Sequence, residues 1–573
     1  MSRPGPHLLA PTEPAATTLV SSASSLAQGL VPFPDDVVSR YLENGSWLRD
    51  SLAESFRQSA RTWPERIALI CDDVQWTYAE LDALADRRAA GLNALGLRPG
   101  SAVLLQINNT ADAVLTWYAL LKAGLIPVCT LSIHRQHEIS EIARQTAPVA
   151  HIVDADNPRF DLVQFALEMK VDAGSDRLIL IEGSSDADGA TALVHVDTLV
   201  PLEQARTIVD TIQQSLRPED VAVFQLSGGT TGVPKVIPRL HAEYWFNASE
   251  YARRLTWDET ARVAYIGPFI HNAGIICGVH GPHSVGATGI LGRPDLELVY
   301  DLLSATGATD IVLGPFAYDV AVDPRLESAT GLRRVLFSGK KVPPEHFAAL
   351  RRRDVWSGQL FGMGEGLCLV TPLDAPETAR MTTVGTPLAV EDEVRILDPS
   401  SEQELETDAV GELCARGPYT LRGYYNAPEH NSRAFTSDGF YRTGDLAAAR
   451  VIDDVTYYTT EGRIKDMINR GGEKISAAEV ELLLVAHPAV AEAALVAMPD
   501  PRLGERACAF LVPSGQEVSL KDIRAHLEAL GVSKYKWPER LVWMDSLPRR
   551  TAVSKIDKVT LRERAQTLTP EPR

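Results

Sequence analysis

Residues 221–239 read VAVFQLSGGTTGVPKVIPR, in which two apolar runs, 221–226 and 236–237, flank a turn rich in glycine and hydroxyl side chains. Glycine adopts positive φ angles without steric cost, so such a turn can direct several backbone N–H groups at one anion. The hydroxyl groups add donors, and the lysine that ends the turn adds a positive charge. The stretch therefore predicts a phosphate-binding loop between two strands, formed by Ser227, Gly228, Gly229, Thr230, Thr231, Gly232 and Lys235.

The best-known alternative phosphate turn is the P-loop, in which a lysine directly follows the last glycine and a Ser or Thr opens a helix. Here Val233 and Pro234 separate Gly232 from Lys235, and Val236 follows the lysine. The spacing therefore disfavours a P-loop nucleotidase. A polar hairpin turn without a ligand stays open as the alternative on these residues alone.

Length and composition limit the class of protein. A chain of 573 residues exceeds one compact core and predicts several packed units. The 56 basic and 75 acidic residues give a net charge of −19, which argues against nucleic acid or an anionic membrane as the main partner. The six cysteines lie far apart, without the spacing of a zinc site, and are typical of a reducing compartment. We find no membrane-spanning run and no secretory signal, and expect a cytoplasmic protein.

Strand and helix patterns alternate along the first part of the chain. Residues 77–95 predict a helix in which Thr77 and Glu80 form a capping box, and 102–107 and 111–123 predict the next strand and helix. Repeated units of this kind predict an α/β fold with largely parallel sheets and helices on both faces. From about residue 384 the pattern changes to short antiparallel strands, and after Gly462 to a smaller α+β unit.

Two carboxylates stand in turns that predict nucleotide contacts. Glu365 lies among glycines in FGMGEG, residues 361–366, and a single carboxylate is what Mg²⁺ uses when phosphates and water supply its other ligands. Asp445 follows Gly444 at a predicted turn, where it could bind two ribose hydroxyls. On these residues alone, a solvated loop is the alternative for each.

Three more segments carry candidate residues. His271 and Asn272 follow an apolar run, Lys555 lies between small residues near the C-terminus, and glycines and charges fill residues 462–474, where the composition changes. Taken singly, these predict a core histidine, a solvated tail and a linker. The combination of all these motifs in this order is not explained by such structural roles alone.

The ordered set resembles the superfamily of adenylate-forming enzymes, which includes acyl-CoA synthetases, peptide-synthetase adenylation domains and firefly luciferase. The resemblance runs from about residue 31 to 562. The VPFP arm, His271-Asn272, FGMGEG, RGPYTLRGYY (416–425) and INRGGEKISAAEVE (468–481) are similar to the stand-alone aryl-acid AMP ligases that act on 2,3-dihydroxybenzoate or salicylate in siderophore and peptide-antibiotic assembly.

This resemblance implies three segments. Residues 1–30 would be a mobile tail, 31–463 a core that binds ATP and an aryl acid, and 464–573 a small mobile α+β lid that carries the catalytic lysine. The core would contain two stacked, mostly parallel sheets and a small β-barrel-like subdomain.

The implied reaction has two halves. A carboxylate attacks the α-phosphate of ATP to give an acyl-adenylate and pyrophosphate, and a thiol then displaces AMP. The resemblance makes Lys555 the adenylation lysine, although Ser554 stands where the family usually has Gly, and Lys465 the hinge. It implies His271 as a further catalytic residue and Glu365 as the Mg²⁺ ligand. The implied nucleotide contacts outside the loop are Ser338, Gly339, Gly362, Met363, Glu365, Asp445 and Arg463.

The acid is less constrained by the resemblance. Its pocket would be lined by Asn272, Ala273, Cys277 and Phe337, with Ala273 in place of the usual large aromatic. Cys277 disfavours a second ring hydroxyl, which it would leave unpaired. We expect a salicylate-like acid, or a larger or differently substituted aryl acid such as a hydroxyanthranilate, picolinate or quinaldate. The thiol would belong to a separate carrier protein, with free CoA as the alternative acceptor. The alternative hypothesis from a different functional class is a non-catalytic binding protein with this fold.

Overall fold

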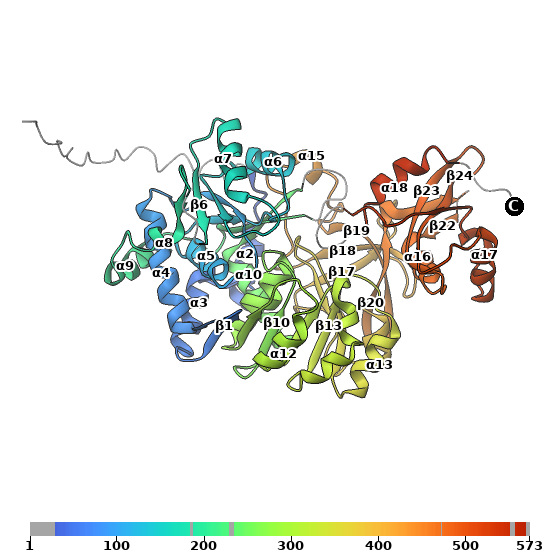
Figure 1. Cartoon of the computed structure of the whole chain (residues 1–573), viewed down its shortest axis with the longest axis horizontal. Coiled ribbons are helices and arrows are strands. Elements are labelled where there is room, and N and C mark those ends of the chain that lie inside the picture. Colours follow the sequence, from blue (N-terminus) through green and yellow to red (C-terminus); the bar gives the residue numbers. More distant parts are fainter. Residues whose placement is uncertain (1–28, 184–186, 228–233, 471–472, 550–555, 569–573) are drawn as a thin grey trace, which may run out of the picture.

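The computed structural model describes residues 29–183, 187–227, 234–470, 473–549 and 556–568. Most of the predicted tail, the loop residues Gly228, Gly229, Thr230, Thr231 and Gly232, and Lys555 therefore lie outside the described residues. The described chain forms layered sheets and helices, followed by a smaller unit at the C-terminal end (Figure 1).

One sheet has the strand order β7-β6-β5-β3-β4-β8-β9. Its strands pair in parallel up to β8, and β9 then turns back antiparallel to β8. The predicted hairpin around the glycine-rich loop is therefore confirmed as the edge of this sheet. The strands are β3 (Ala102–Gln106), β4 (Ile126–Val128), β5 (Ala150–Asp154), β6 (Leu178–Glu182), β7 (Thr191–Ala192), β8 (Val221–Leu226) and β9 (Val236–Leu240).

A second sheet has the order β16-β15-β14-β13-β12-β10-β11-β1-β2. The strands from β1 to β14 along this order pair in parallel, and β2, β15 and β16 are antiparallel at the two edges. The strands are β1 (Ile67–Cys71), β2 (Val74–Thr77), β10 (Arg262–Tyr265), β11 (Thr288–Leu291), β12 (Asp310–Leu313), β13 (Arg334–Ser338), β14 (Trp356–Gly362), β15 (Cys368–Val370) and β16 (Thr386–Pro387).

Helices pack between and around these sheets (Figure 1). One hydrophobic cluster joins Val103 of β3 and Val263 of β10 to residues of α3, α4, α5 and α10, so these helices lie between the two sheets. The predicted stacked sheets are thus confirmed. The helices are α2 (Asp35–Asn44), α3 (Leu52–Thr62), α4 (Tyr78–Ala94), α5 (Ala111–Lys122), α6 (Gln136–Thr146), α7 (Leu162–Asp172), α8 (Leu193–Val196), α9 (Leu202–Gln213), α10 (His241–Arg254), α11 (Gly281–Ser284), α12 (Val299–Thr306), α13 (Pro344–Arg352), α14 (Glu377–Thr382) and α15 (Pro428–Asn431).

Local sequence and buried charge both fix this helical layer. Thr77 caps α4, and Glu80 completes the predicted capping box. The ammonium of Lys122 on α5 is fully buried, and its Nζ lies 2.6 Å from Oδ1 of Asp86 on α4. Arg57 of α3 also lies 2.6 Å from Asp86. Because an unpaired buried charge is costly, this network holds three helices in one arrangement.

A third sheet has the antiparallel order β17-β18-β19-β20. Here one prediction is wrong: Gly444 and Asp445 lie inside the strand β19, not at a turn. Gly444 takes a φ of +70°, and the pairing of β18 with β19 shifts register at this point, so the irregularity is accommodated within the strand. The strands are β17 (Glu393–Leu397), β18 (Gly411–Arg416), β19 (Tyr441–Ile452) and β20 (Val455–Arg463).

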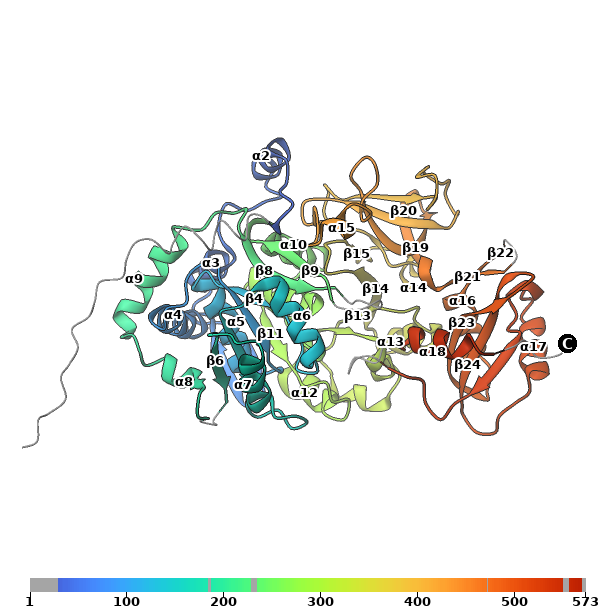
Figure 2. The ribbon, with the colours of Figure 1, turned by 90° about the horizontal axis from the view of Figure 1, so that it is seen from above.

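The C-terminal elements gather at one end of the molecule (Figure 2). Their sheet has the order β22-β21-β24-β23, with β25 paired to β24, and α16 packs against it. The elements are β21 (Met467–Arg470), β22 (Glu473–Ser476), α16 (Ala477–Val485), β23 (Val490–Asp500), β24 (Gly504–Pro513), α17 (Leu520–Ala529), β25 (Arg540–Trp543) and α18 (Lys558–Ala565). The predicted α+β unit is confirmed. Among the described residues, no helix is long and apolar enough to cross a membrane.

Candidate active site

The neck of the glycine-rich loop is closed by Ser227 and Lys235. The Ser227 N–H donates to the Lys235 carbonyl at 2.9 Å, and the Lys235 N–H donates to Ser227 Oγ at 2.9 Å. Leu226 pairs with Val236 just below them, so the strands position both ends of the loop. The serine hydroxyl thus has a structural role in closing the hairpin.

Glu365 lies between β14 and β15, where Tyr424 contacts it. The Tyr424 hydroxyl donates to Glu365 Oε1 at 2.7 Å, and the Leu421 N–H donates to the Glu365 carbonyl at 2.9 Å. Burial and the neighbouring Glu365 carboxylate raise the pKa of Tyr424, so the phenol keeps its proton and can donate. Lys235 Nζ lies 5.1 Å from the centre of the same ring, within the range of a cation–π contact.

The backbone around Glu365 is shaped by glycine. Gly366 has a φ of +98°, and a Cβ there would lie 1.7 Å from the Tyr419 carbonyl oxygen. Glycine is therefore required for the loop to approach this segment so closely. Gly362 ends β14, and the Met363 N–H donates to the Leu367 carbonyl at 3.1 Å, which closes the FGMGEG turn.

The donor set fits a magnesium ion held mainly by phosphate. Within the described part of the chain, no group of three or more His, Cys, Asp or Glu side chains could hold a metal ion. One carboxylate, Glu365, contacts the hydroxyl of Tyr424, and Lys235 at the neck of the loop contacts the ring of the same tyrosine. This matches Mg²⁺, which takes few protein oxygens and fills its coordination with phosphate and water.

Ser338 is the last residue of β13, and Gly339 begins the turn that follows it. The Tyr318 hydroxyl oxygen lies 3.0 Å from the carbonyl oxygens of both Ser338 and Lys340, and accepts a hydrogen bond from the Lys340 N–H at 3.1 Å. Gly339 has a φ of +112°, a conformation that other residues rarely adopt. Phe337, a predicted acid-pocket residue, is 1% exposed and packs edge-to-face on Tyr318 in the core beneath the turn.

Asp445 and Arg463 face each other across β19 and β20. Arg463 Nε donates to Asp445 Oδ1 at 2.8 Å, and the two residues are paired in the strand register. Asp445 is largely buried, whereas the Arg463 side chain is 41% exposed. The structure therefore brings together the two residues expected at the ribose, on adjacent strands.

Asn272 is held by residues that the sequence analysis missed. Its Oδ1 accepts hydrogen bonds from Arg239 Nη1 and from the Tyr244 hydroxyl, both at 2.9 Å. Arg239 also makes a buried bidentate pair with Glu243, with distances of 2.8 and 2.7 Å. Because arginine only donates, the amide oxygen must face Arg239 and the NH₂ group must face the other way. The only signal in the sequence for this role was Arg239 itself, a charged residue near the end of an otherwise apolar strand.

Ala273 is half-buried at the start of a buried helical segment that contains Cys277. Ala273 precedes the π-helix Gly274–His280, a rare form that is frequent at functional sites. Cys277 is 3% exposed and lies beside Tyr251, and burial raises the pKa of its thiol to about 12. His271 lies before this helix, and its carbonyl accepts from the Ile275 N–H at 3.1 Å. Asn272, Ala273 and Cys277 thus lie along one segment, whereas Phe337, the fourth predicted acid-pocket residue, lies in a separate core cluster. Asn272 Nδ2 donates to the Met363 carbonyl at 3.4 Å.

Lys465 stands in the short turn Ile464–Asp466 between β20 and β21. Partial burial and the charge of Arg463 lower its pKa to about 8. Arg562 of α18 donates to the Lys465 carbonyl at 3.1 Å and pairs with Asp466. Lys555 lies outside the described residues, but Lys558, three positions later, has its Nζ 2.6 Å from Glu481 Oε1.

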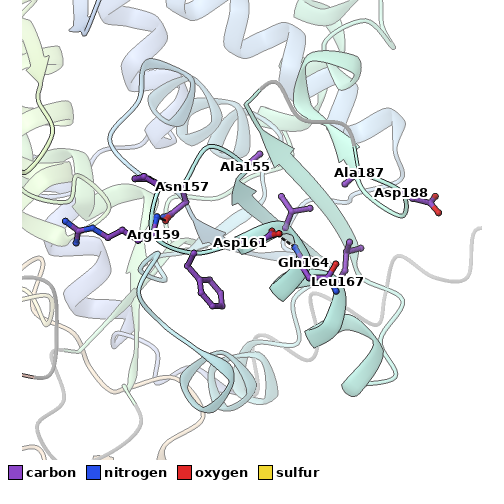
Figure 3. A pocket seen from close by; sticks show the side chains of 11 residues that line it. Ala155, Asn157, Arg159, Asp161, Gln164, Leu167, Ala187 and Asp188 are labelled. Carbon is purple, nitrogen blue, oxygen red and sulfur yellow. Dashed lines mark hydrogen bonds between the residues drawn. The ribbon is translucent and has the colours of Figure 1, made fainter.

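A surface hollow of about 780 Å³ lies apart from these residues, beside α7 (Figure 3). Asn157, Arg159 and Asp161 are among its lining residues, and none of the predicted site residues that the structure describes lines it. We therefore take the residues described above, and not this hollow, as the candidate active site.

The chain matches the family model "AMP-binding enzyme" over residues 56–425 and the model "AMP-binding enzyme C-terminal domain" over residues 479–555. It therefore belongs to the AMP-binding enzyme family, and the resemblance noted in the sequence is confirmed at this level.

Individual relatives agree with this assignment. Pyochelin synthase PchD of Pseudomonas aeruginosa is 41% identical, with 93% of this chain and 95% of that protein covered. A Streptomyces protein named salicylyl-CoA synthase / salicylate adenylyltransferase is 38% identical, with 94% and 97% covered. The solved apo structure of MbtA from Mycobacterium smegmatis has a TM-score of 0.71 and 37% identity, with 94% of this chain and 99% of that chain covered.

Proposed function

We propose that this enzyme activates an aryl carboxylic acid with ATP and passes the acyl group to a thiol. A carboxylate oxygen of the acid attacks the α-phosphorus, the bond to the bridging oxygen breaks, and pyrophosphate leaves. The thiol then attacks the acyl carbon and AMP leaves. The observation that carries the proposal is that Lys235 and Glu365 both contact Tyr424, Glu365 at its hydroxyl and Lys235 at its ring.

Different residues would contact the phosphates, the ribose and the adenine of ATP. Lys235 would contact phosphate oxygens together with the loop 228–232, and Glu365 would hold Mg²⁺, which supplies charge neutralisation on the phosphates when bound. Asp445, with Arg463 beside it, would accept hydrogen bonds from the ribose hydroxyls, and the Ser338–Gly339 turn would frame the adenine. Gly362 and Met363 belong to the turn that presents Glu365.

Asn272 narrows the class of acid. Its oxygen already accepts from Arg239 and Tyr244, so the group it offers to a ligand is an N–H donor. The substituent beside the substrate carboxylate should therefore be an acceptor, such as a hydroxyl oxygen or a ring nitrogen. Salicylate and picolinate fit better than acids whose only ortho group is an amine. Ala273 and Cys277 would line the rest of the ring pocket, and Phe337 would lie behind the turn that frames the adenine. His271 would act at the reacting carboxylate.

The acceptor is proposed to be the phosphopantetheine thiol of a separate carrier protein, in siderophore or peptide-antibiotic assembly. Residues 464–573 would form a lid that turns about Lys465 and brings Lys555 to the reacting carboxylate in the first half-reaction. Free CoA is the alternative acceptor, and the relative named salicylyl-CoA synthase / salicylate adenylyltransferase keeps it open. A transfer assay with CoA and carrier protein in parallel separates the two.

ATP–pyrophosphate exchange across substituted benzoates, picolinates and quinoline carboxylates tests the first half-reaction. We expect exchange with salicylate-like acids, and its loss in Lys555→Ala, while transfer from preformed adenylate stays largely intact. Normal exchange in Lys555→Ala would refute the role of the lysine. An absence of exchange with every aryl acid would refute the proposed substrate class.

A further inference from the structure

Tyr424 links the two charged side chains that would meet the triphosphate. Its hydroxyl lies 2.7 Å from Glu365 Oε1, and its ring lies under Lys235 at 5.1 Å. The residue is 2% exposed, so it is too deeply placed to serve as a solvent-facing contact. One side chain therefore sets the relative positions of a carboxylate and an ammonium that come from distant parts of the chain.

The direction of the hydrogen bonds follows from counting protons. The Tyr424 hydroxyl also lies 2.8 Å from the Tyr441 hydroxyl. A phenol has one proton, and the ionised Glu365 can only accept, so Tyr424 donates to Glu365 and Tyr441 donates to Tyr424. Tyr441 begins β19, the strand that carries Asp445. A relay of two phenols thus connects Glu365 to the ribose strand.

The backbone fixes the position of Tyr424. The Tyr424 N–H donates to Asn431 Oδ1 at 2.8 Å, and Asn431 Nδ2 donates back to the Tyr424 carbonyl at 2.9 Å. The Leu421 N–H holds the Glu365 carbonyl. Glu365 is therefore held at its backbone and at its carboxylate by the same short segment, residues 421–424.

We infer that Tyr424 is a positioning residue that orients the Glu365 carboxylate toward a Mg²⁺ ion carried by ATP. The hydrogen bond uses Oε1, so Oε2 would be the oxygen that binds the cation. This inference rests on the proposed function, because it requires that ATP binds at this site. A hydrogen bond to a charged group is among the stronger ones, so its loss should be measurable in binding.

Tyr424→Phe removes only the hydroxyl, because the phenyl ring that contacts Lys235 is retained. Calorimetric titration with ATP in Mg²⁺ and in chelator is the measurement. We expect binding with Mg²⁺ to weaken about tenfold and binding without metal to change less than about twofold. In exchange assays, the Mg²⁺ concentration for half-maximal rate should rise, and the rate at saturating Mg²⁺ should approach that of the wild type.

Two comparison variants make the result specific. Tyr425→Phe is the matched control, since the ring of Tyr425 packs on Phe224 at 4.7 Å and has no part in the relay. Glu365→Gln should lose the same Mg²⁺ dependence, and adding Tyr424→Phe to it should have little further effect. Thermal unfolding checks that each variant folds.

Three outcomes would overturn the inference: unchanged affinity with Mg²⁺ in Tyr424→Phe, an equal loss without metal, or full additivity with Glu365→Gln. A wild-type protein that binds Mg²⁺ and ATP but exchanges pyrophosphate with no aryl acid would refute the proposed substrate class alone. The inference on Tyr424 would then still stand on the binding data.

Discussion

The two ends of the candidate site are built differently. At the acid end, Arg239 and Glu243 have side chains that are 1% and 4% exposed, and they hold Asn272 in one orientation. At the end of the proposed hinge, called the hinge end below, the charged pair of Arg562 and Asp466 has side chains that are 27% and 21% exposed. An arginine–carboxylate ion pair is therefore buried in the core at one end and partly exposed to water at the other.

This difference indicates which end can move. A buried charge pair resists opening, because separating it would expose each charge to a low-dielectric interior without a partner. A partly solvated pair can separate at little cost, because water replaces the partner. Both partners of the solvated pair lie within residues 464–573, so we infer only that the turn around Lys465 can rearrange locally, whereas selection of the acid depends on the buried residues around Asn272.

The largest effect is expected from Arg239→Leu at the buried end. This change leaves the Glu243 carboxylate without its cation and should destabilise the fold by about 3–5 kcal/mol. Chemical denaturation measures the free energy of unfolding. Arg253→Ala, on the helix α10 that carries Glu243, is the control: its pair with Glu250 has an arginine side chain that is 64% exposed, and it should cost under about 1 kcal/mol. Equal losses in the two variants would break the comparison.

An intermediate effect is expected from Asp445→Asn, between the two ends. The neutral amide keeps the shape but loses a charged acceptor, so AMP and ATP should bind roughly tenfold more weakly. Calorimetry measures the affinity. Asp454→Asn, in the exposed turn between β19 and β20, should leave it unchanged. If Asp445→Asn bound nucleotide as well as the wild type, the assignment of the ribose to β19 would be wrong.

The smallest effect on stability is expected from Arg562→Ala at the hinge end. The pair with Asp466 is partly solvated, so the unfolding free energy should fall by about 0–1 kcal/mol. The ratio of adenylation to thioester formation should nevertheless change, because Arg562 also holds the Lys465 carbonyl. Single-turnover assays of each half-reaction measure this ratio. A loss of stability as large as that of Arg239→Leu would show that the hinge is as rigid as the core.

Much of the fold was predictable because its signals are local. The capping residues Thr77 and Glu80 lie three positions apart, and the apolar runs around the glycine-rich loop lie within twenty residues, so short-range patterns defined α4 and the hairpin β8–β9. The alternation of strands and helices likewise predicted the parallel sheets. The turn expected at Asp445 was wrong, because a glycine with positive φ can also sit in a strand where the register shifts.

The sequence by itself thus determined the class of fold and the family, since both depend on local pattern and on the order of the motifs. Only the tertiary structure showed that Tyr424 contacts Glu365, 59 positions away, and that Arg239 orients Asn272, 33 positions away. Such contacts depend on which strands become neighbours and on which side chains are buried together. The spacing of residues along the sequence predicts neither. The residues that set the charge and the orientation of the site therefore emerged only when the chain was folded.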